Sequence, residues 1–333
     1  MRQGAISSAI LFSVYIDDLI LVLKRSRLGC EIDGIYFGIL VYADNILLLS
    51  ASRMGLQSMV NICERFTSDR NLKFGTSQDP VKSKTKCIAF SKRVRDCQNL
   101  APIRLNGQDL PWVNKVSHLG CTLESNNSMK TDIQQKRGKF IGKVHSLMQE
   151  FHFARKDVLM KLVDTYTTSF YGSPLWDPLS ADCDRIYKSW NVTVRNIFGV
   201  DRTTHRYLIE PISKSVHPKV MLLSRLVGFY KAQLKSPKLS VQFLIRIAEK
   251  DQRTVLGRTL DFIRVKCGLK TDEVEKLTPL IVKTKIRYMQ IPETEKWRIP
   301  MIVEMMNLRA NLADIHGFTS SEFEAMLFDV CTS

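Results

Sequence analysis

Residues 35–50 read IYFGILVYADNILLLS, and this stretch decides the fold of the first part of the chain. Two apolar runs, Ile35–Tyr42 and Ile46–Leu49, are rich in Ile, Leu, Val and Tyr and have the length of strands. Ala43-Asp44-Asn45 stands between them, and Asp and Asn are favoured in tight turns. The pattern predicts a β-hairpin with the carboxylate of Asp44 and the amide of Asn45 at its tip.

Helices and short strands are predicted on both sides of this hairpin. Apolar positions spaced three or four residues apart indicate helices over residues 5–25 and 54–70. The predicted strands are Leu72–Phe74, Cys87–Phe90, Val116–Leu123 and a second hairpin, Ile103–Leu105 and Asp109–Val113 around Asn106-Gly107. From about residue 129 the strand patterns fade, and helices are predicted at Met129–Glu150, Ala154–Tyr171, Asp182–Phe198, Pro218–Leu234 and through most of the remainder.

The composition favours a partner with negative charge. The 333 residues carry a formal net charge of +16, which is expected to attract polyanions, nucleic acid first; a solvated basic surface without a partner is the alternative. The eight cysteines form no C-x-x-C pair and no zinc-spaced cluster, which is typical of free thiols in an intracellular compartment, nucleus or cytoplasm. The apolar stretch Ala9–Leu23 contains two aspartates and is too short to span a membrane, so no membrane partner is expected.

The hairpin tip carries the chemistry of greatest interest. Nucleotidyl transfer uses two divalent metal ions, and magnesium takes oxygen ligands, chiefly carboxylates. A tight hairpin between apolar strands holds such ligands rigidly. Tyr42-Ala43-Asp44-Asn45 resembles the Tyr-x-Asp-Asp box of reverse transcriptases, with the last Asp replaced by Asn.

Other segments resemble the same family in the same order. Upstream there are Arg2-Gln3-Gly4, Ser8 and Leu11-Phe12; downstream there are Leu72-Lys73-Phe74, the lysine-rich stretch 82–87 and His118-Leu119-Gly120. Tyr171–Trp176, Ser189-Trp190-Asn191, Arg195 and Thr204–Glu210 are similar to the region after the palm in Jockey-like non-LTR (LINE-like) retrotransposons. The chain is thus identified as similar to a reverse transcriptase of that family over about residues 1–260.

The resemblance implies an RNA-directed DNA polymerase that binds Mg²⁺, deoxynucleotides and RNA or an RNA–DNA hybrid. It implies that Asp44 and Asn45 are catalytic and metal-binding residues. The residues implied near the nucleotide or template are Gln3, Gly4, Ser8, Tyr42, Lys84 and Lys86. His118, Leu119 and Gly120 are the implied primer grip. For Lys84 and Lys86, a solvated edge is the alternative role.

Together with the change of pattern near residue 129, the resemblance predicts an α+β chain. Residues 1–125 are expected to form a partial polymerase palm of the right-hand reverse transcriptase fold, with the Asp44 hairpin central in its sheet. Residues 126–240 are expected to form a helical thumb or connection, and 241–333 a helical C-terminal region of unassigned role.

Two departures from the family weaken the expected activity. In the family the strand with the first metal-binding aspartate lies upstream of the Gln-Gly segment, and we expect it to be missing here, so that the chain is a truncated fragment. Asn45 offers one neutral acceptor oxygen where aspartate offers two charged ones. A non-catalytic nucleic-acid-binding remnant and a decayed genomic relic are therefore alternatives to an active polymerase.

Three further interpretations concern single groups of residues. Lys136, Lys139 and Lys143 recur at helical spacings of three and four, which predicts a stripe that contacts nucleic-acid backbone, with a solvated helix face as the alternative. Tyr15-Ile16-Asp17-Asp18 imitates the catalytic box but falls in a predicted helix, so its aspartates are interpreted as solvent-facing. The tryptophans Trp112, Trp176 and Trp190 are interpreted as packing residues.

Overall fold

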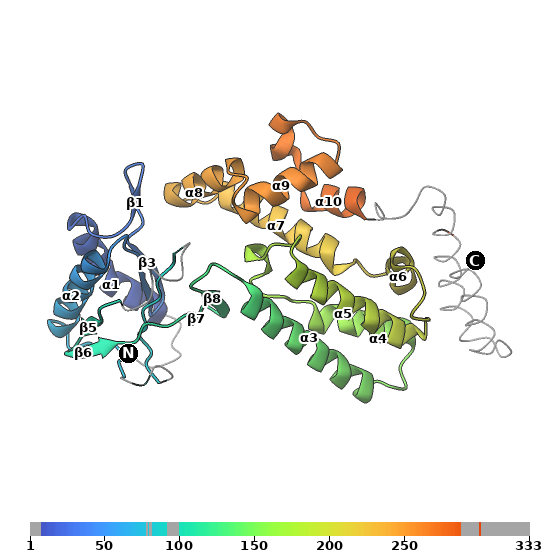
Figure 1. The fold of residues 1–333 in the computed structure, drawn as a ribbon, viewed down its shortest axis with the longest axis horizontal. Coiled ribbons are helices and arrows are strands. Elements are labelled where there is room, and N and C mark those ends of the chain that lie inside the picture. The colour runs from blue at the N-terminus through green and yellow to red at the C-terminus, as the bar shows by residue number, and fades with distance from the viewer. Residues whose placement is uncertain (1–7, 78, 80–81, 92–99, 288–299, 301–333) are drawn as a thin grey trace. The chain divides into compact units, whose positions relative to one another are not determined.

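The computed structural model describes residues 8–77, 79, 82–91, 100–287 and 300 of the chain (Figure 1). The chain divides into two compact units: the first contains residues 1–118 and 122–128, and the second contains 119–121 and 129–333. Among the described residues, strands occur only between residues 31 and 124, and helices follow. The predicted α+β class is confirmed.

The described residues among the first 128 form two helices and four pairs of short strands. Their bounds are α1 Ser8–Arg25, β1 Glu31–Ile32, β2 Ile35–Tyr36, β3 Ile39–Tyr42, β4 Asn45–Leu48, α2 Arg53–Ser68, β5 Ile103–Leu105, β6 Gln108–Leu110, β7 Lys115–His118 and β8 Cys121–Glu124. The strands pair in chain order, β1 with β2, β3 with β4, β5 with β6 and β7 with β8. Both helices and the β3–β4 hairpin lie where the sequence pattern predicts them.

The core of this unit lies between the β3–β4 hairpin and its two helices. Ile39 of β3 is buried with Leu19 of α1 and with Met59 and Cys63 of α2. Successive strand residues point to opposite faces, so Val41 joins this core while Leu40 stays exposed. α1 and α2 lie side by side next to β3 (Figure 1). The helices therefore fix the hairpin from one face.

The second predicted hairpin is confirmed and is held by polar side chains of α2. Asn106 and Gly107 both have left-handed φ values, 53° and 72°, as a two-residue hairpin turn requires. Gln57 of α2 binds the backbone of Arg104 twice, donating to its carbonyl (2.9 Å) and accepting from its N–H (2.8 Å). Glu64 accepts from the N–H of Asn106 at 2.9 Å.

Five details of the predicted strands are wrong. The run Ile35–Tyr42 is split, because its first residues pair with β1 and only its second half pairs with β4. Within the described part of the chain the β3–β4 sheet has only two strands, so the Asp44 hairpin is not central in a larger sheet. Val116–Leu123 is not one strand but the two strands β7 and β8.

The other two wrong details are the strands predicted at Leu72–Phe74 and Cys87–Phe90. Leu72–Phe74 is irregular: Asn71 has a left-handed φ of 54°, and the Leu72 N–H bonds back to Thr67 O at the end of α2. Cys87 makes a single parallel bridge to Trp112. Pro111 has no N–H to extend that ladder.

The described part of the second unit is mainly helical. Its helices are α3 Lys130–Glu150, α4 Lys156–Thr167, the short η2 Ser173–Leu175, α5 Ala181–Phe198, α6 Arg206–Ser213, α7 Pro218–Leu234, α8 Leu239–Lys250, α9 Val255–Lys266, η3 Thr271–Lys276 and α10 Pro279–Ile286. α3, α4 and α5 pack side by side over one hydrophobic cluster, and α7 to α10 enclose a second (Figure 1). No described helix is long and apolar enough to cross a bilayer.

Local signals explain where the helices of this unit begin and end. The Ser180 side chain accepts from the Cys183 N–H at the start of α5, and Gly199 ends this helix with a left-handed φ of 70°. The helix predicted to reach Tyr171 ends at Thr167, because Phe170 and Gly172 both adopt left-handed φ values. The helices predicted at Met129–Glu150, Asp182–Phe198 and Pro218–Leu234 are confirmed to within a residue.

Candidate nucleic-acid interface

The predicted catalytic box occupies the turn of the β3–β4 hairpin. Tyr42 and Asn45 are the last paired residues, so Ala43 and Asp44 alone form the turn. Asp44 and Asn45 are exposed, and Tyr42 is 68% exposed. The tip therefore presents one carboxylate and one amide to solvent.

These two side chains do not fit a two-metal centre by themselves. The resemblance implies Mg²⁺, which needs several oxygen ligands, and a two-metal site holds its ions about 3.5–4 Å apart between shared carboxylates. In the described part of the chain, no three His, Cys, Asp or Glu side chains come together as candidate ligands. Asp44 supplies one carboxylate and Asn45 one neutral oxygen.

The turn contains a strained residue. Ala43 has a left-handed φ of 50°, a conformation that costs an L-residue about 1–2 kcal/mol and costs glycine almost nothing. We expect Ala43→Gly to raise the free energy of unfolding by about 0.5–1 kcal/mol, after the greater freedom of glycine in the unfolded chain is subtracted. Urea unfolding followed by circular dichroism measures the change.

Ala232→Gly is the control for this prediction. Ala232 lies exposed in the helix α7, where glycine is expected to destabilise by about 1 kcal/mol. A destabilising Ala43→Gly would contradict the strain at the hairpin tip.

The second Asp-Asp pair lies on a helix, as predicted. Asp17 and Asp18 are exposed on α1, while Ile16 between Tyr15 and Asp17 is buried. Asp18 forms an ion pair with Arg70 at 3.4 Å. The interpretation of this pair as a solvent-facing helix surface is confirmed.

The residues implied around the nucleotide are only partly described. Gln3 and Gly4 lie outside the described residues, and Ser8 begins α1 without a described side chain. Lys84 is exposed and Lys86 half-buried. No hydrogen bond or ion pair joins either lysine to the hairpin tip in the described part of the chain, and their nucleotide role stays a prediction.

The loop that carries the two lysines is closed by Ser83. This serine is buried, donates to Thr85 O at 2.6 Å and accepts from the Ser77 N–H at 3.3 Å. The Thr85 N–H in turn donates to Gly75 O at 3.0 Å. Lys84 and Lys86, which follow Ser83, therefore lie on an ordered turn.

The implied primer-grip residues form a tight turn. His118 ends β7, and Leu119 and Gly120 follow with left-handed φ values of 45° and 77°. The carbonyl of Gly120 accepts a 2.7 Å hydrogen bond from Lys136 Nζ on α3. The ammonium of Lys136 also lies 5.6 Å from the centre of the Tyr171 ring, within the range of a cation–π contact.

A buried polar cluster anchors this turn to the helical unit. Asp132, only 1% exposed, accepts a 2.8 Å hydrogen bond from the indole N–H of Trp176 and lies 3.9 Å from Lys136 Nζ. Gly172 packs so closely on Cys121 that a Cβ there would come within 2.5 Å of the sulfur. We call Gly120, Cys121, Asp132, Lys136, Tyr171, Gly172 and Trp176 the Asp132 cluster.

Two lysines of the predicted stripe make contacts within the protein, and the role of the stripe in binding nucleic acid stays a prediction. The Lys136 side chain is 14% exposed and is committed to Asp132 and Gly120. Lys143 is exposed but donates to Tyr166 O at 3.1 Å. Lys139 is exposed. The spacing of lysines along α3 did not predict that Lys136 makes contacts within the protein.

The tryptophans behave mainly as predicted. Trp176 and Trp190 are fully buried in the core of the helical unit, and their interpretation as packing residues is confirmed. Trp112 is half-buried against the second hairpin and donates to Ala101 O at 3.2 Å.

The described cysteines are free thiols. Burial raises the pKa of Cys63 and Cys183 to about 12 and that of Cys87 to about 11. These thiols therefore stay protonated near neutral pH and are poor nucleophiles.

The sequence reasoning did not predict a basic groove in the second unit. The groove lies along α5 and the segment that connects α5 to α6, and the residues that line it include Lys188, Asn191, Arg195, Arg202 and Arg206. Lys188 and Arg195 are seven residues apart and therefore lie on one face of α5. That spacing was the only available signal, because Arg202 and Arg206 come close only through the turn after α5.

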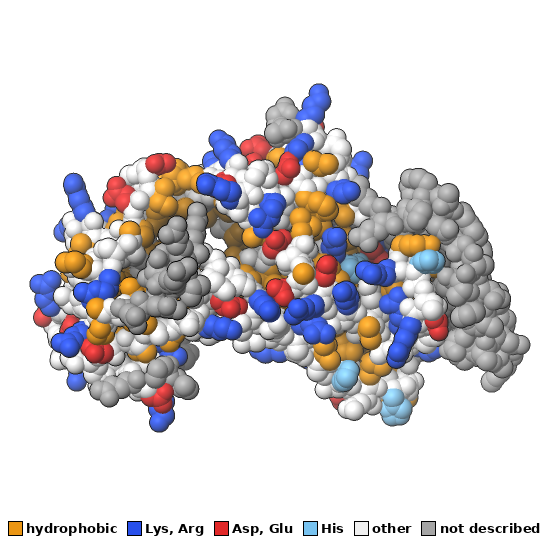
Figure 2. All heavy atoms as spheres, viewed as in Figure 1, with side chains coloured by type: hydrophobic (Ala, Val, Ile, Leu, Met, Phe, Trp, Pro, Cys, Tyr) orange, Lys and Arg blue, Asp and Glu red, His pale blue; other side chains and the backbone are white. Residues whose placement is uncertain are grey.

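Basic side chains are not confined to the groove. Figure 2 shows Lys and Arg spread over the visible face of each unit, as the net charge of +16 leads one to expect. No family model matches the chain, and no curated protein matches it.

Proposed function

We propose that this chain is a reverse transcriptase of the non-LTR retrotransposon kind that binds RNA or an RNA–DNA hybrid but does not extend a primer by itself. The observation that carries the proposal is the position of the Tyr-Ala-Asp-Asn box on a two-residue hairpin turn. One face of that hairpin is covered by α1 and α2, which leaves the tip free to meet a ligand. In this proposal the first unit is a partial palm and the helices after it are the thumb and C-terminal region.

The charge and the tip favour binding over catalysis. A net charge of +16 attracts the phosphate backbone without regard to sequence. Phosphoryl transfer, in contrast, depends on metal ions that neutralise charge as it develops. Asp44 is the single carboxylate at the tip, and Asn45 adds no charge to hold a second ion.

We therefore expect no template-directed extension of a labelled primer by the purified chain with Mg²⁺ and deoxynucleotides. Denaturing gel electrophoresis of the primer measures it, and an active reverse transcriptase on the same template and primer is the positive control. Extension by this chain that disappears in Asp44→Ala would contradict the expected lack of activity.

Asn45→Asp is the informative second variant. It restores the Tyr-x-Asp-Asp pattern and adds a charged ligand beside Asp44 without altering the size of the side chain. We expect this variant to bind Mn²⁺ more tightly than the parent chain does. The paramagnetic relaxation of water protons measures the binding. Equal Mn²⁺ binding by Asn45→Asp and the parent would mean that the hairpin tip is not a metal-binding position.

A further inference from the structure

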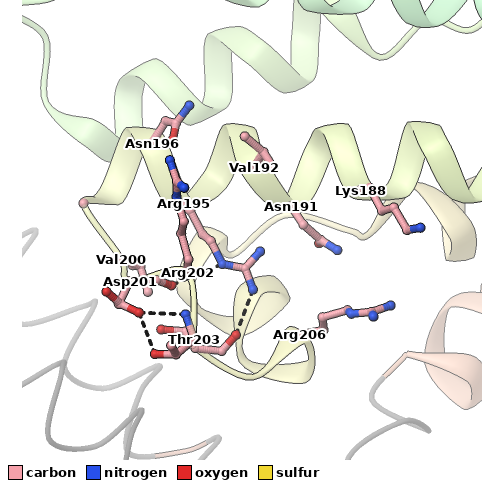
Figure 3. Close-up of a pocket in the computed structure, with 12 residues that line it drawn as sticks. Lys188, Asn191, Val192, Arg195, Asn196, Val200, Asp201, Arg202, Thr203 and Arg206 are labelled. Atoms are coloured by element: carbon pink, nitrogen blue, oxygen red, sulfur yellow. Dashed lines mark hydrogen bonds between the residues drawn. The ribbon is translucent and has the colours of Figure 1, made fainter.

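The groove along α5 is lined by cations that have few partners. Among the described residues, Lys188, Arg195, Arg202 and Arg206 line it together with one acidic residue, Asp201 (Figure 3). No ion pair of Lys188, Arg202 or Arg206 is found within the part of the chain that the structure describes. The groove has a volume of about 1470 Å³. Small-molecule pockets typically have about 300–1,000 Å³, so this space suits a segment of an extended ligand.

Arg195 stabilises the wall of the groove. Part of its guanidinium group is already used in hydrogen bonds within the protein, so only the rest can bind a ligand. Its Nη2 donates to Thr204 O at 2.8 Å, and its Nε donates to Asp201 O at 3.3 Å. These bonds hold the segment after α5 against the helix. Burial and the nearby charge of Arg206 both lower the pKa of Arg195, so the cations of the groove repel one another until an anion neutralises them.

The negative charge of Asp201 only partly offsets the attraction of the groove for an anion. Its carboxylate accepts hydrogen bonds from the N–H (2.7 Å) and the hydroxyl (2.5 Å) of Thr203. These bonds lower the pKa of the Asp201 carboxyl, which stays ionised. The positive charges of Arg195 and Arg202 lie close enough to stabilise it. The remaining cations still outnumber this single acid.

Asn191 supplies an independent sign of a ligand. Asn191 is buried, with an exposure of 6%, and its Oδ1 has no hydrogen-bond partner among the residues that the structure describes. In Figure 3 the Asn191 side chain projects from α5 toward Arg206. A buried amide oxygen without a partner is costly and uncommon in folded proteins. The protein keeps a polar group here where leucine would fill the same space.

We infer that this groove binds the backbone of a nucleic-acid strand, with phosphates on Arg202, Arg206 and Lys188 and the Asn191 amide on the adjoining nucleotide. Guanidinium groups bind phosphate oxygens with two parallel hydrogen bonds. An amide has one donor and one acceptor face, and a nucleotide unit offers both phosphate oxygens and hydroxyl or amino donors. The inference rests on the proposed function and names the surface that carries it.

The test measures the binding of a fluorescently labelled single-stranded RNA by anisotropy, with the full chain at one salt concentration. The groove variant is Arg202→Gln with Arg206→Gln. The matched control is Lys235→Gln with Lys238→Gln, which removes two exposed charges of the same unit outside the groove. We expect the groove variant to bind about 10-fold more weakly or worse, and the control to change affinity by less than about 2-fold. Equal losses in the two variants would overturn the inference.

Asn191→Leu separates a ligand contact from a structural role. Because leucine has almost the same size and removes an unpaired polar group, the melting temperature is expected to stay the same or rise while RNA affinity falls. A lower melting temperature with unchanged affinity would overturn the role of Asn191. Unlabelled RNA is expected to displace the probe far better than inorganic phosphate at equal phosphate concentration, and equal displacement would mean a site for free anions only. A parent chain that binds no RNA would contradict the proposed function itself.

Discussion

Asp132→Ala is expected to destabilise the helical unit by about 3 kcal/mol, because it removes the acceptor of the buried Trp176 N–H and the carboxylate that faces Lys136. Asp132 is almost fully buried and accepts from the indole N–H of Trp176 at 2.8 Å. It also faces the ammonium of Lys136 at 3.9 Å. Alanine removes the acceptor and the charge together, and the cavity adds to the cost.

The measurement is thermal unfolding by differential scanning calorimetry, in which about 3 kcal/mol corresponds to roughly a 10 °C lower Tm for a unit of this size. Asp132→Asn is the control, because it keeps an oxygen acceptor for Trp176 and removes only the charge. We expect it to cost about 1 kcal/mol. Equal losses for the two variants would show that the charge facing Lys136, and not the bond to Trp176, is the main contribution.

Gly172→Ala is expected to cost about 2–5 kcal/mol, the sum of two contributions. Gly172 has a φ of 84°, where an L-residue is strained by about 1–2 kcal/mol. A Cβ at this position would also come within 2.5 Å of Cys121 Sγ, so the backbone or the thiol must move. Overpacking of this kind costs about 1–3 kcal/mol.

Gly138→Ala is the matched control for Gly172→Ala. Gly138 lies in the middle of α3, and a Cβ there would meet no atom within 4 Å. Alanine at a helical position is expected to stabilise by about 0.5–1 kcal/mol. Urea unfolding of both variants should therefore give changes of opposite sign, and a neutral Gly172→Ala would contradict the close packing of the Asp132 cluster.

The parts of the fold that the sequence predicted depend on local chemistry. The Asn106-Gly107 turn was predictable because both residues tolerate the left-handed conformation that a two-residue hairpin needs. The helix from Pro218 to Leu234 begins with proline at its first position, where the missing N–H has no cost. The turn at Ala43-Asp44 was predictable from two apolar runs with a polar break.

The parts that were not predicted depend on distant partners. The first residues of the run Ile35–Tyr42 pair with Glu31–Ile32, and no local pattern distinguishes them from the rest of the run. Lys136 looked like one of three equivalent surface lysines, and its contact with Gly120 depends on a turn sixteen residues earlier. The groove forms because Arg195 bonds to the carbonyls of Asp201 and Thr204, which spacing alone does not reveal.

Lys136 belongs to the Asp132 cluster and is mostly buried. Nucleic acid is therefore expected to bind elsewhere on the helical unit. Lys136 makes its contacts within the protein. We therefore expect nucleic acid to contact Lys139 and the groove residues Lys188, Arg202 and Arg206. Each phosphate that such a cation neutralises contributes about −0.9 to the slope of log affinity against log salt for a B-form duplex.

The most direct test of the proposed function is a titration of a labelled RNA–DNA hybrid with the unmodified chain at several salt concentrations. If about four phosphates are neutralised, the affinity should fall by roughly 100-fold between about 50 and about 200 mM salt. Hybrids of unrelated sequence should bind equally well, because the backbone carries the interaction. An affinity that does not change with salt, or no binding at the lowest salt concentration, would contradict nucleic-acid binding as the function of this chain.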